Sequence, residues 1–326
     1  MKTIALLLFV LPALAAAKIN WPFSYYNVDY TLLNITVTSS GQTLHLDFGD
    51  FGAGHSSNLY VAASYFNFSS SLTFNQTAEI VDSENRTGIR GTDDFTFGNE
   101  NATFLNLPVD VLDVDVRGGE KIGEVGWNVP TDGSLSFIQS VLKELEEEVV
   151  VFSFDPYDFL TLAPGLITLG GRPADRCSSG WTRVPTIPIT RPEDQWAVAL
   201  DEFSFGYSTF EAAGSVRFSL RWGNANLPLK YKAPLYRAWG VASDARGLPC
   251  NTTLDLVFRV GETEIRLPAT DYVSQNQHWT ATGYCGSNIF FHDTEDEFTL
   301  PATIFQRHCL ELDYAHARMG FAPRLM

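Results

Sequence analysis

The sequence predicts a mainly β fold built as two lobes. Short runs of alternating or wholly apolar residues recur along the chain, and clusters of Gly, Asn, Asp and Ser separate them, a pattern typical of strands joined by turns. With 326 residues, of which 45% are hydrophobic, the chain is long enough to bury a sizeable core. A proline-rich stretch at 184–192 indicates a lobe boundary near residue 190.

The apolar runs give the expected strands in chain order. Each is short, is rich in β-branched or aromatic residues, and ends in turn-forming residues. The expected strands cover 30–37, 43–46, 59–63, 95–97, 149–154, 166–169, 197–205 and 254–260. A further short strand beginning at Val216 breaks into a turn at 221–225.

One segment departs from the β pattern. Between residues 132 and 148, apolar side chains recur at three- and four-residue steps, while several glutamates face the other way. The apolar positions are Leu135, Ile138, Leu142 and Leu145. We expect a single amphipathic helix from Asp132 to Glu148, capped by Asp132 or Ser134, that leads into a buried strand.

Residues 1–17 have the pattern of a secretory signal peptide. A basic start is followed by an apolar run and by small residues at a cleavage site. No later apolar run approaches the roughly 20 residues that a spanning helix needs, so we expect no membrane insertion. Six N-x-S/T sequons also indicate a secreted glycoprotein. Their asparagines are Asn34, Asn67, Asn75, Asn85, Asn101 and Asn251.

The cysteine count and the net charge indicate which covalent bonds, metal sites and binding partners to expect. Four cysteines in an oxidising compartment predict two disulfides, and their spacing leaves three pairings open. The sequence has no C-x-x-C or H-x-x-x-H pair, so neither a metal site nor a cofactor is expected. A net charge of −16 argues against nucleic acid and anionic membranes as partners, and an acidic lumen would partly neutralise it.

Seven short segments carry a resemblance that extends over nearly the whole mature chain. They occur in one order and at consistent spacings. The segments are 56–61 (S-S-N-L-Y-V), 87–93 (T-G-I-R-G-T-D), 151–154 (V-F-S-F), 165–171 (G-L-I-T-L-G-G), 196–200 (W-A-V-A-L), 298–305 (F-T-L-P-A-T-I-F) and 319–323 (M-G-F-A-P). Together they resemble the pepsin-like aspartic protease family.

The resemblance implies a bilobal, mainly antiparallel β fold with a cleft between the lobes. The N-terminal lobe would cover 18–190 and the C-terminal lobe 191–326. The resemblance also implies two disulfides. Cys250 and Cys285 stand where the family closes a loop in its second lobe, and Cys177 and Cys309 match an extra pair of nematode-type members.

The second catalytic loop of the family is altered in this chain. Active members place one aspartate in a D-T/S-G turn of each lobe, and the two carboxylates share a proton. In the second lobe, the alignment places Arg221 on the aspartate and Trp222 on the following hydroxyl residue, and only Gly223 is kept. A guanidinium with a pKa above about 12 cannot act as a general base.

The first catalytic loop and the flap are also degenerate. Counting back without gaps from Ser56 places Ala53 on the first aspartate, whereas either D-F-G at 47–52 offers Asp47 or Asp50 as a residual carboxylate. The family's flap tyrosine falls on Val81. About a dozen residues separate Ala17 from the expected strand at Tyr30, which leaves little room for the inhibitory propeptide of active members.

These observations favour a pseudoprotease. We expect a secreted, glycosylated, monomeric protein that has lost peptide hydrolysis and holds an extended peptide or protein segment in the cleft by strand addition. Its compartment would be extracellular or the lysosomal lumen. A second hypothesis is an active endopeptidase with a repositioned dyad built on Asp47 or Asp50, and a third is a structural extracellular glycoprotein.

Overall fold

The computed structural model describes most of the chain. The described residues are 18–27, 30–47, 58–63, 66–81, 87–97, 102–112, 123–155, 165–188, 195–220, 224–242, 247–279, 283–293 and 296–325. The expected signal peptide at 1–17 lies outside them. Within the described residues, no helix is both long and apolar enough to cross a membrane.

Strands dominate, so the predicted mainly β class is confirmed. The largest sheet draws on both ends of the chain. Its strands are β1 (Ile19–Asn27), β2 (Tyr30–Val37), β3 (Thr43–Asp47), β4 (Leu59–Ala62), β5 (Asn75–Val81), β6 (Thr87–Phe97), β7 (Ala102–Leu112), β8 (Gly123–Val125), β9 (Val149–Phe154), β10 (Gly165–Leu169), β11 (Thr182–Pro185), β22 (His308–Asp313) and β23 (Arg318–Pro323). They are ordered β11-β23-β22-β9-β10-β1-β2-β3-β8-β4-β7-β6-β5.

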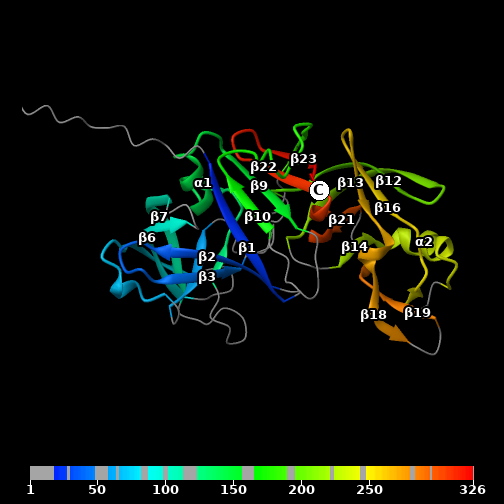
Figure 1. The fold of residues 1–326 in the computed structure, drawn as a ribbon, viewed down its shortest axis with the longest axis horizontal. Coiled ribbons are helices and arrows are strands. Elements are labelled where there is room, and N and C mark those ends of the chain that lie inside the picture. The colour runs from blue at the N-terminus through cyan, green and yellow to red at the C-terminus, as the bar shows by residue number, and fades with distance from the viewer. Residues whose placement is uncertain are drawn as a thin grey trace, which may run out of the picture.

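Two smaller sheets contain the remaining strands. The second sheet has the order β17-β16-β12-β13-β21-β14-β20, and the third has the order β15-β19-β18. Their strands are β12 (Val198–Phe205), β13 (Ser208–Phe218), β14 (Ala225–Pro228), β15 (Leu248–Pro249), β16 (Leu256–Val260), β17 (Thr263–Leu267), β18 (Val273–Trp279), β19 (Tyr284–Ser287), β20 (Ile289–His292) and β21 (Glu297–Leu300). Figure 1 shows these strands to the right of β1–β10, with β22 and β23 between the two groups.

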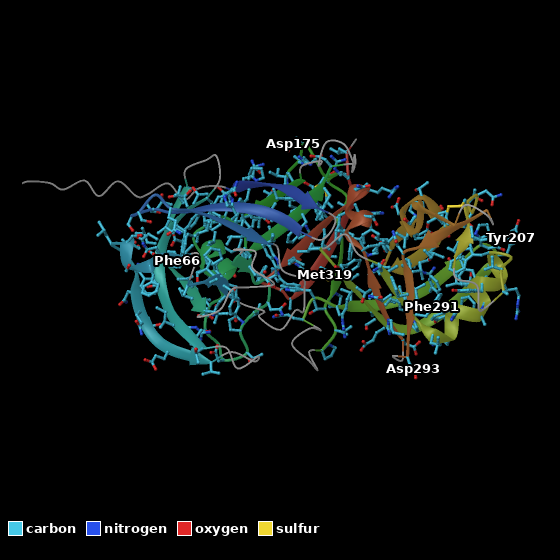
Figure 2. All side chains as sticks on the ribbon, turned by 90° about the horizontal axis from the view of Figure 1, so that it is seen from below. Phe66, Asp175, Tyr207, Phe291, Asp293 and Met319 are labelled. Carbon is cyan, nitrogen blue, oxygen red and sulfur yellow. A yellow bond between two sulfur atoms is a disulfide. The ribbon has the colours of Figure 1, made fainter. Side chains whose placement is uncertain are left out.

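The helices are few and short. The α-helices are α1 (Phe137–Leu142), α2 (Lys232–Ala238) and α3 (Ala269–Tyr272), and the 3₁₀ turns include η1 (Phe68–Ser70), η4 (Leu229–Tyr231) and η5 (Ala302–Gln306). In Figure 2, Met319 of β23 lies near the middle of the molecule, whereas Phe66 and Tyr207 lie toward opposite ends. The last strands of the chain are therefore central to the fold.

Most expected strands form within one or two residues of their predicted bounds. The strands at 30–37 and 149–154 match β2 and β9. The expected strand at 95–97 is only the end of β6. The first strand is not at Tyr30 but begins at Ile19, where buried Ile19, Trp21 and Phe23 alternate with more exposed residues.

The expected long helix at 132–148 is wrong in length and in its cap. Helix α1 has six residues, and Ser136 caps it in a reciprocal box with Gln139. Asp132 instead accepts hydrogen bonds from Ser134. Gly133, at φ +80°, excludes a helix on the N-terminal side. On the C-terminal side, the glutamates that follow Leu142 repel one another and the negative end of the helix dipole.

A chain of aromatic rings joins the two larger sheets. Phe305 lies 5.6 Å from Phe154 of β9 and 5.9 Å from Phe218 of β13, measured between ring centroids. Phe218 in turn lies 5.3 Å from Phe321 of β23. All four rings are buried. Since Phe218 is the last residue of β13, this apolar packing fixes the point at which the chain leaves that strand.

Both disulfides have the pairing that the resemblance implies. Cys177 is bonded to Cys309, with Cα atoms 6.0 Å apart, and Cys250 is bonded to Cys285, with Cα atoms 5.0 Å apart. The first bond ties the segment before β11 to β22. The second closes a loop between the segment after β15 and β19. Each bond therefore fixes chain segments that no helix supports.

The lowered pKa of His308, at the start of β22, leads us to expect that the protein loses stability in acid. Burial, together with the charge of Arg307, lowers the pKa of His308 from 6.5 to about 4. Between these pH values the unfolded chain binds a proton that the folded protein does not. The free energy of unfolding should therefore fall by about 3 kcal/mol as the pH falls from about 6.5 to about 4.

Urea unfolding of the wild type and of His308→Gln at pH 7 and pH 5 checks this. The variant should lose less stability than the wild type on acidification. Asp313 contributes in the same direction only at lower pH, because hydrogen bonds from Arg318 and His316 outweigh burial and hold its pKa below the ordinary 3.8. Equal pH dependence in the wild type and the His308 variant would contradict the assignment.

Candidate functional site

Two chain connections have the same unusual topology. In the largest sheet, β3 and β4 are consecutive strands, yet β8 lies between them. β3 runs parallel to β8 and β4 runs antiparallel to it, so that Asp47 and Tyr60 both pair in register with Glu124. The connection from β3 to β4, residues 48–58, therefore joins two strands that lie on either side of β8. We call it the first connection.

The second sheet repeats this arrangement. β21 lies between the consecutive strands β13 and β14, parallel to β13 and antiparallel to β14. Thr299 of β21 pairs with Arg217 on one side and with Asn226 on the other. The chain at 219–224, which we call the second connection, is thus the topological equivalent of the first.

The second connection carries no carboxylate. Its sequence is S-L-R-W-G-N, and Arg221 occupies its middle. At its start, the Ser219 amide donates to the Leu300 carbonyl at 2.8 Å and Leu220 is fully buried. Arg221 itself, with Trp222 and Gly223, lies outside the described residues.

The first connection is longer and contains one acidic residue, Asp50. Asp47 lies just before it, as the last residue of β3. Asp50 and Ala53 lie outside the described residues, and for Asp47 only its backbone position is described. The assignment of Asp47, Asp50 or Ala53 to the first catalytic position therefore stays a prediction.

The β5–β6 hairpin lies at the edge of the same sheet, where the family's flap is expected. Val81 pairs with Thr87 in the last register position before the connection at 82–86. Val81 is 65% exposed. It helps to line an open hollow of about 380 Å³ between the two strands, together with Glu79, Ile80, Thr87, Gly88 and Ile89. Neither Val81 nor residues 82–86 supply a tyrosine.

An ion pair between a partly exposed arginine and a buried carboxylate connects this hairpin to the end of the first connection. Arg90 of β6 donates through Nε and Nη2 to the two carboxylate oxygens of Asp110 on β7, at 2.6 and 2.8 Å. The Asn58 amide, at the end of the first connection, donates to Asp110 at 2.9 Å. Asp110 is fully buried, and its hydrogen bond raises the pKa of Arg90. A bidentate pair of this kind holds both partners in one orientation.

The same pairing continues across the sheet as a polar row. Asp110 is in register with Tyr60, and Tyr60 is in register with Glu124. Residues directly opposite one another in a sheet share a face. Glu124 is 6% exposed. At the equivalent position of the second sheet, β21 carries the uncharged Thr299.

Comparison with protein families gives the decisive observation. Residues 135–324, more than half of the chain, match the family described as eukaryotic aspartyl protease. The chain belongs to the eukaryotic aspartyl protease family. The matched range contains the second connection but not the first. A comparison with curated proteins found no match.

Aspartyl proteases need two carboxylates close enough to share one proton. One accepts a proton from the attacking water while the other, still protonated, polarises the peptide carbonyl. The second connection of this aspartyl protease family member contains no Asp or Glu in its sequence. Among the described residues, no group of three or more His, Cys, Asp or Glu side chains is arranged to hold a metal ion.

Sequence reasoning missed Arg90, Asp110 and Glu124. Arg90 lies inside a segment that was read only for its resemblance, and Asp110 lies in the alternating stretch V-D-V-L-D-V-D that indicates a strand. A charged residue alternating with valines would have been the signal for a buried, paired carboxylate. Glu124 lies on a three-residue strand that is too short to be recognised from its pattern.

Replacing Arg90 with Gln should destabilise the protein by about 3 kcal/mol, because it leaves the fully buried Asp110 without its cation. The loss should lie near the low end of the range for buried pairs, since the Arg90 side chain is 42% exposed and water can enter. Urea unfolding at neutral pH measures it. The matched change Arg266→Gln, at an exposed pair with Glu264, should cost less than about 1 kcal/mol. Equal losses in the two variants would contradict a stabilising role for the buried pair.

Proposed function

We propose that this protein is a secreted, N-glycosylated pseudoprotease that binds an extended peptide or protein segment without cleaving it. One observation carries the proposal: the second connection holds Arg221 at its middle and no carboxylate anywhere in its sequence. A guanidinium there would pair with a carboxylate of the first connection and keep it ionised. Catalysis by this family needs one proton shared between two carboxyl groups, and a carboxylate held ionised by an arginine cannot take part in that sharing.

The proposed binding site is the cleft between an N-terminal lobe, 18–190, and a C-terminal lobe, 191–326. The two equivalent connections support this division, because one lies in each part of the chain. The β5–β6 hairpin would close over a bound segment, which would add as a strand through its backbone groups. Val81, exposed at the end of β5, would contact that segment with an apolar side chain in place of a tyrosine hydroxyl.

Secretion and glycosylation are supported by the sequons and the disulfides. The four described sequon asparagines, Asn34, Asn67, Asn75 and Asn251, are all exposed. Asn85 and Asn101 lie outside the described residues. Two disulfides suit an extracellular or lysosomal compartment. We propose that the protein acts there as a monomer.

Binding of the statine-type inhibitor pepstatin tests the proposal. Titration calorimetry with the wild type should show saturable binding, and mass spectrometry of a co-incubated substrate peptide should show it intact. Val81→Asp should weaken binding at least about tenfold, equivalent to about 1.4 kcal/mol. Leu72→Asp, a matched change at a residue that is 89% exposed before the far end of β5, should leave binding unchanged.

The two other hypotheses predict different results. Pepstatin-sensitive cleavage of the peptide would indicate an active endopeptidase with a dyad built on Asp47 or Asp50. Absence of both binding and cleavage would indicate a structural glycoprotein. Either result would overturn the proposed function.

A further inference from the structure

Two arginines converge on one oxygen of a single carboxylate at the end of β9. Arg176 Nη2 donates to Asp155 Oδ1 at 2.5 Å, and Arg324 Nη2 donates to the same oxygen. Asp155 directly follows β9, Arg176 precedes the disulfide at Cys177, and Arg324 follows β23. Figure 2 shows the neighbouring Asp175 at the surface of the molecule.

The backbone holds the two arginines next to each other. Cys177 and Arg324 form a β-bridge, and the Leu325 amide donates to the Arg176 carbonyl at 2.7 Å. The Arg324 amide is bonded to the Arg307 carbonyl at 2.9 Å. The disulfide between Cys177 and Cys309 anchors the same segment to β22. The site is therefore built on fixed backbone.

The charges at this site do not balance. Among the described residues, two guanidiniums share one carboxylate, so the three side chains together carry one positive charge. The side chains of Arg324, Arg176 and Asp155 are 10%, 21% and 26% exposed. Burial, together with the like charge of Arg176, lowers the pKa of Arg324. Keeping an uncompensated charge out of water costs several kcal/mol, so a counter-ion would relieve a real penalty.

Two hydrogen-bond donors at this site also lack an acceptor among the described residues. The Nε groups of Arg176 and Arg324 are both buried, and neither has an acceptor in the part of the chain that the structure describes. Two other partly buried arginines of this protein direct Nε at a carboxylate: Arg183 donates to Glu311 at 2.7 Å and Arg318 donates to Asp313 at 3.2 Å. A buried donor without a partner costs about 1–3 kcal/mol.

We propose that Arg176 and Arg324 form a binding site for a small inorganic oxyanion of the sulfate or phosphate class, next to Asp155. An oxyanion would accept from both Nε donors and balance the excess charge. Planar guanidinium forks match oxyanions in geometry better than they match a spherical halide. The net charge of −16 does not oppose such a site strongly, because charges more than about 8–10 Å away are screened at physiological salt.

Equilibrium dialysis with radiolabelled sulfate and phosphate, at constant ionic strength in sodium chloride, tests the site directly. The wild type should bind one anion saturably, and chloride should compete only weakly. Arg324→Gln should weaken binding at least about tenfold. The matched control Arg266→Gln, which removes an equally charged but exposed arginine, should bind as the wild type does.

Asp155→Asn tests the same claim in the opposite direction. It removes the competing carboxylate but keeps both arginines, so the anion should bind more tightly, by about tenfold. A purely structural Asp155 would give no such gain. Absence of saturable binding in the wild type, unchanged binding in Arg324→Gln, or weaker binding in Asp155→Asn would each overturn the proposal. If Arg324→Gln does not fold, the wild-type and Asp155→Asn measurements decide it.

Discussion

The purified protein is expected to cleave denatured haemoglobin at least about 10²–10⁴-fold more slowly than an active aspartyl protease assayed beside it at about pH 3–6. That factor is the loss expected when one general acid–base partner is removed. The second connection, between β13 and β14, contains only serine, leucine, arginine, tryptophan, glycine and asparagine residues. None of these can take up or release the shared proton in that pH range.

Lowering the pH does not restore the missing group. The pKa of an arginine stays above about 12, so Arg221 remains cationic across the whole range in which the family works. Any residual cleavage should therefore be insensitive to pepstatin and should vary between preparations, as contamination does. Pepstatin-sensitive cleavage within tenfold of the active enzyme would contradict the loss of the dyad.

The second large effect concerns the disulfide between Cys177 and Cys309. Replacing both cysteines with alanine should lower the free energy of unfolding by up to about 5 kcal/mol, because the bond closes a loop with a sequence separation of 132. The bond between Cys250 and Cys285, with a separation of 35, should contribute up to about 4 kcal/mol. Both values are upper estimates from loop entropy.

Packing around the disulfide between Cys177 and Cys309 should add to the loss of unfolding free energy when this bond is removed. Cys309 is fully buried on β22, and it packs with Val151 of β9 and with Trp181. Removing the sulfurs therefore also leaves a small cavity in the central sheet. Urea unfolding of the two double variants measures both effects. A loss at Cys177 and Cys309 smaller than that at Cys250 and Cys285 would contradict this order.

The sequence predicted the positions of the strands better than it predicted which strands pair in the sheets. Runs such as Tyr30–Val37 and Val149–Phe154 are apolar and β-branched enough to be recognised locally, and both form as expected. The alternation of Ile19, Trp21 and Phe23 was missed because Pro22 interrupts the run and reads as a strand breaker. The expected long helix does not form, because Gly133 and the glutamates after Leu142 oppose it despite the apolar spacing.

The site was predictable only in part, for a topological reason. The turn around Arg221 was visible because the apolar strand before it ends sharply. The interposed strands β8 and β21 were not visible as such, since they pair across long sequence separations and β8 has only three residues. The repeated arrangement came from the structure alone. It shows only that the strands before and after 48–58 and those before and after 219–224 are paired in the same way, each around one interposed strand.

The central claim is that an arginine occupies the position of the second catalytic carboxylate. The distance from the Arg221 guanidinium to the nearest carboxylate of Asp47 or Asp50 in a crystal structure tests it most directly. We predict an ion pair within about 4 Å and no carboxylate contributed by the second connection. Two carboxylates within hydrogen-bond reach of one water, with Arg221 turned into solvent, would contradict the claim.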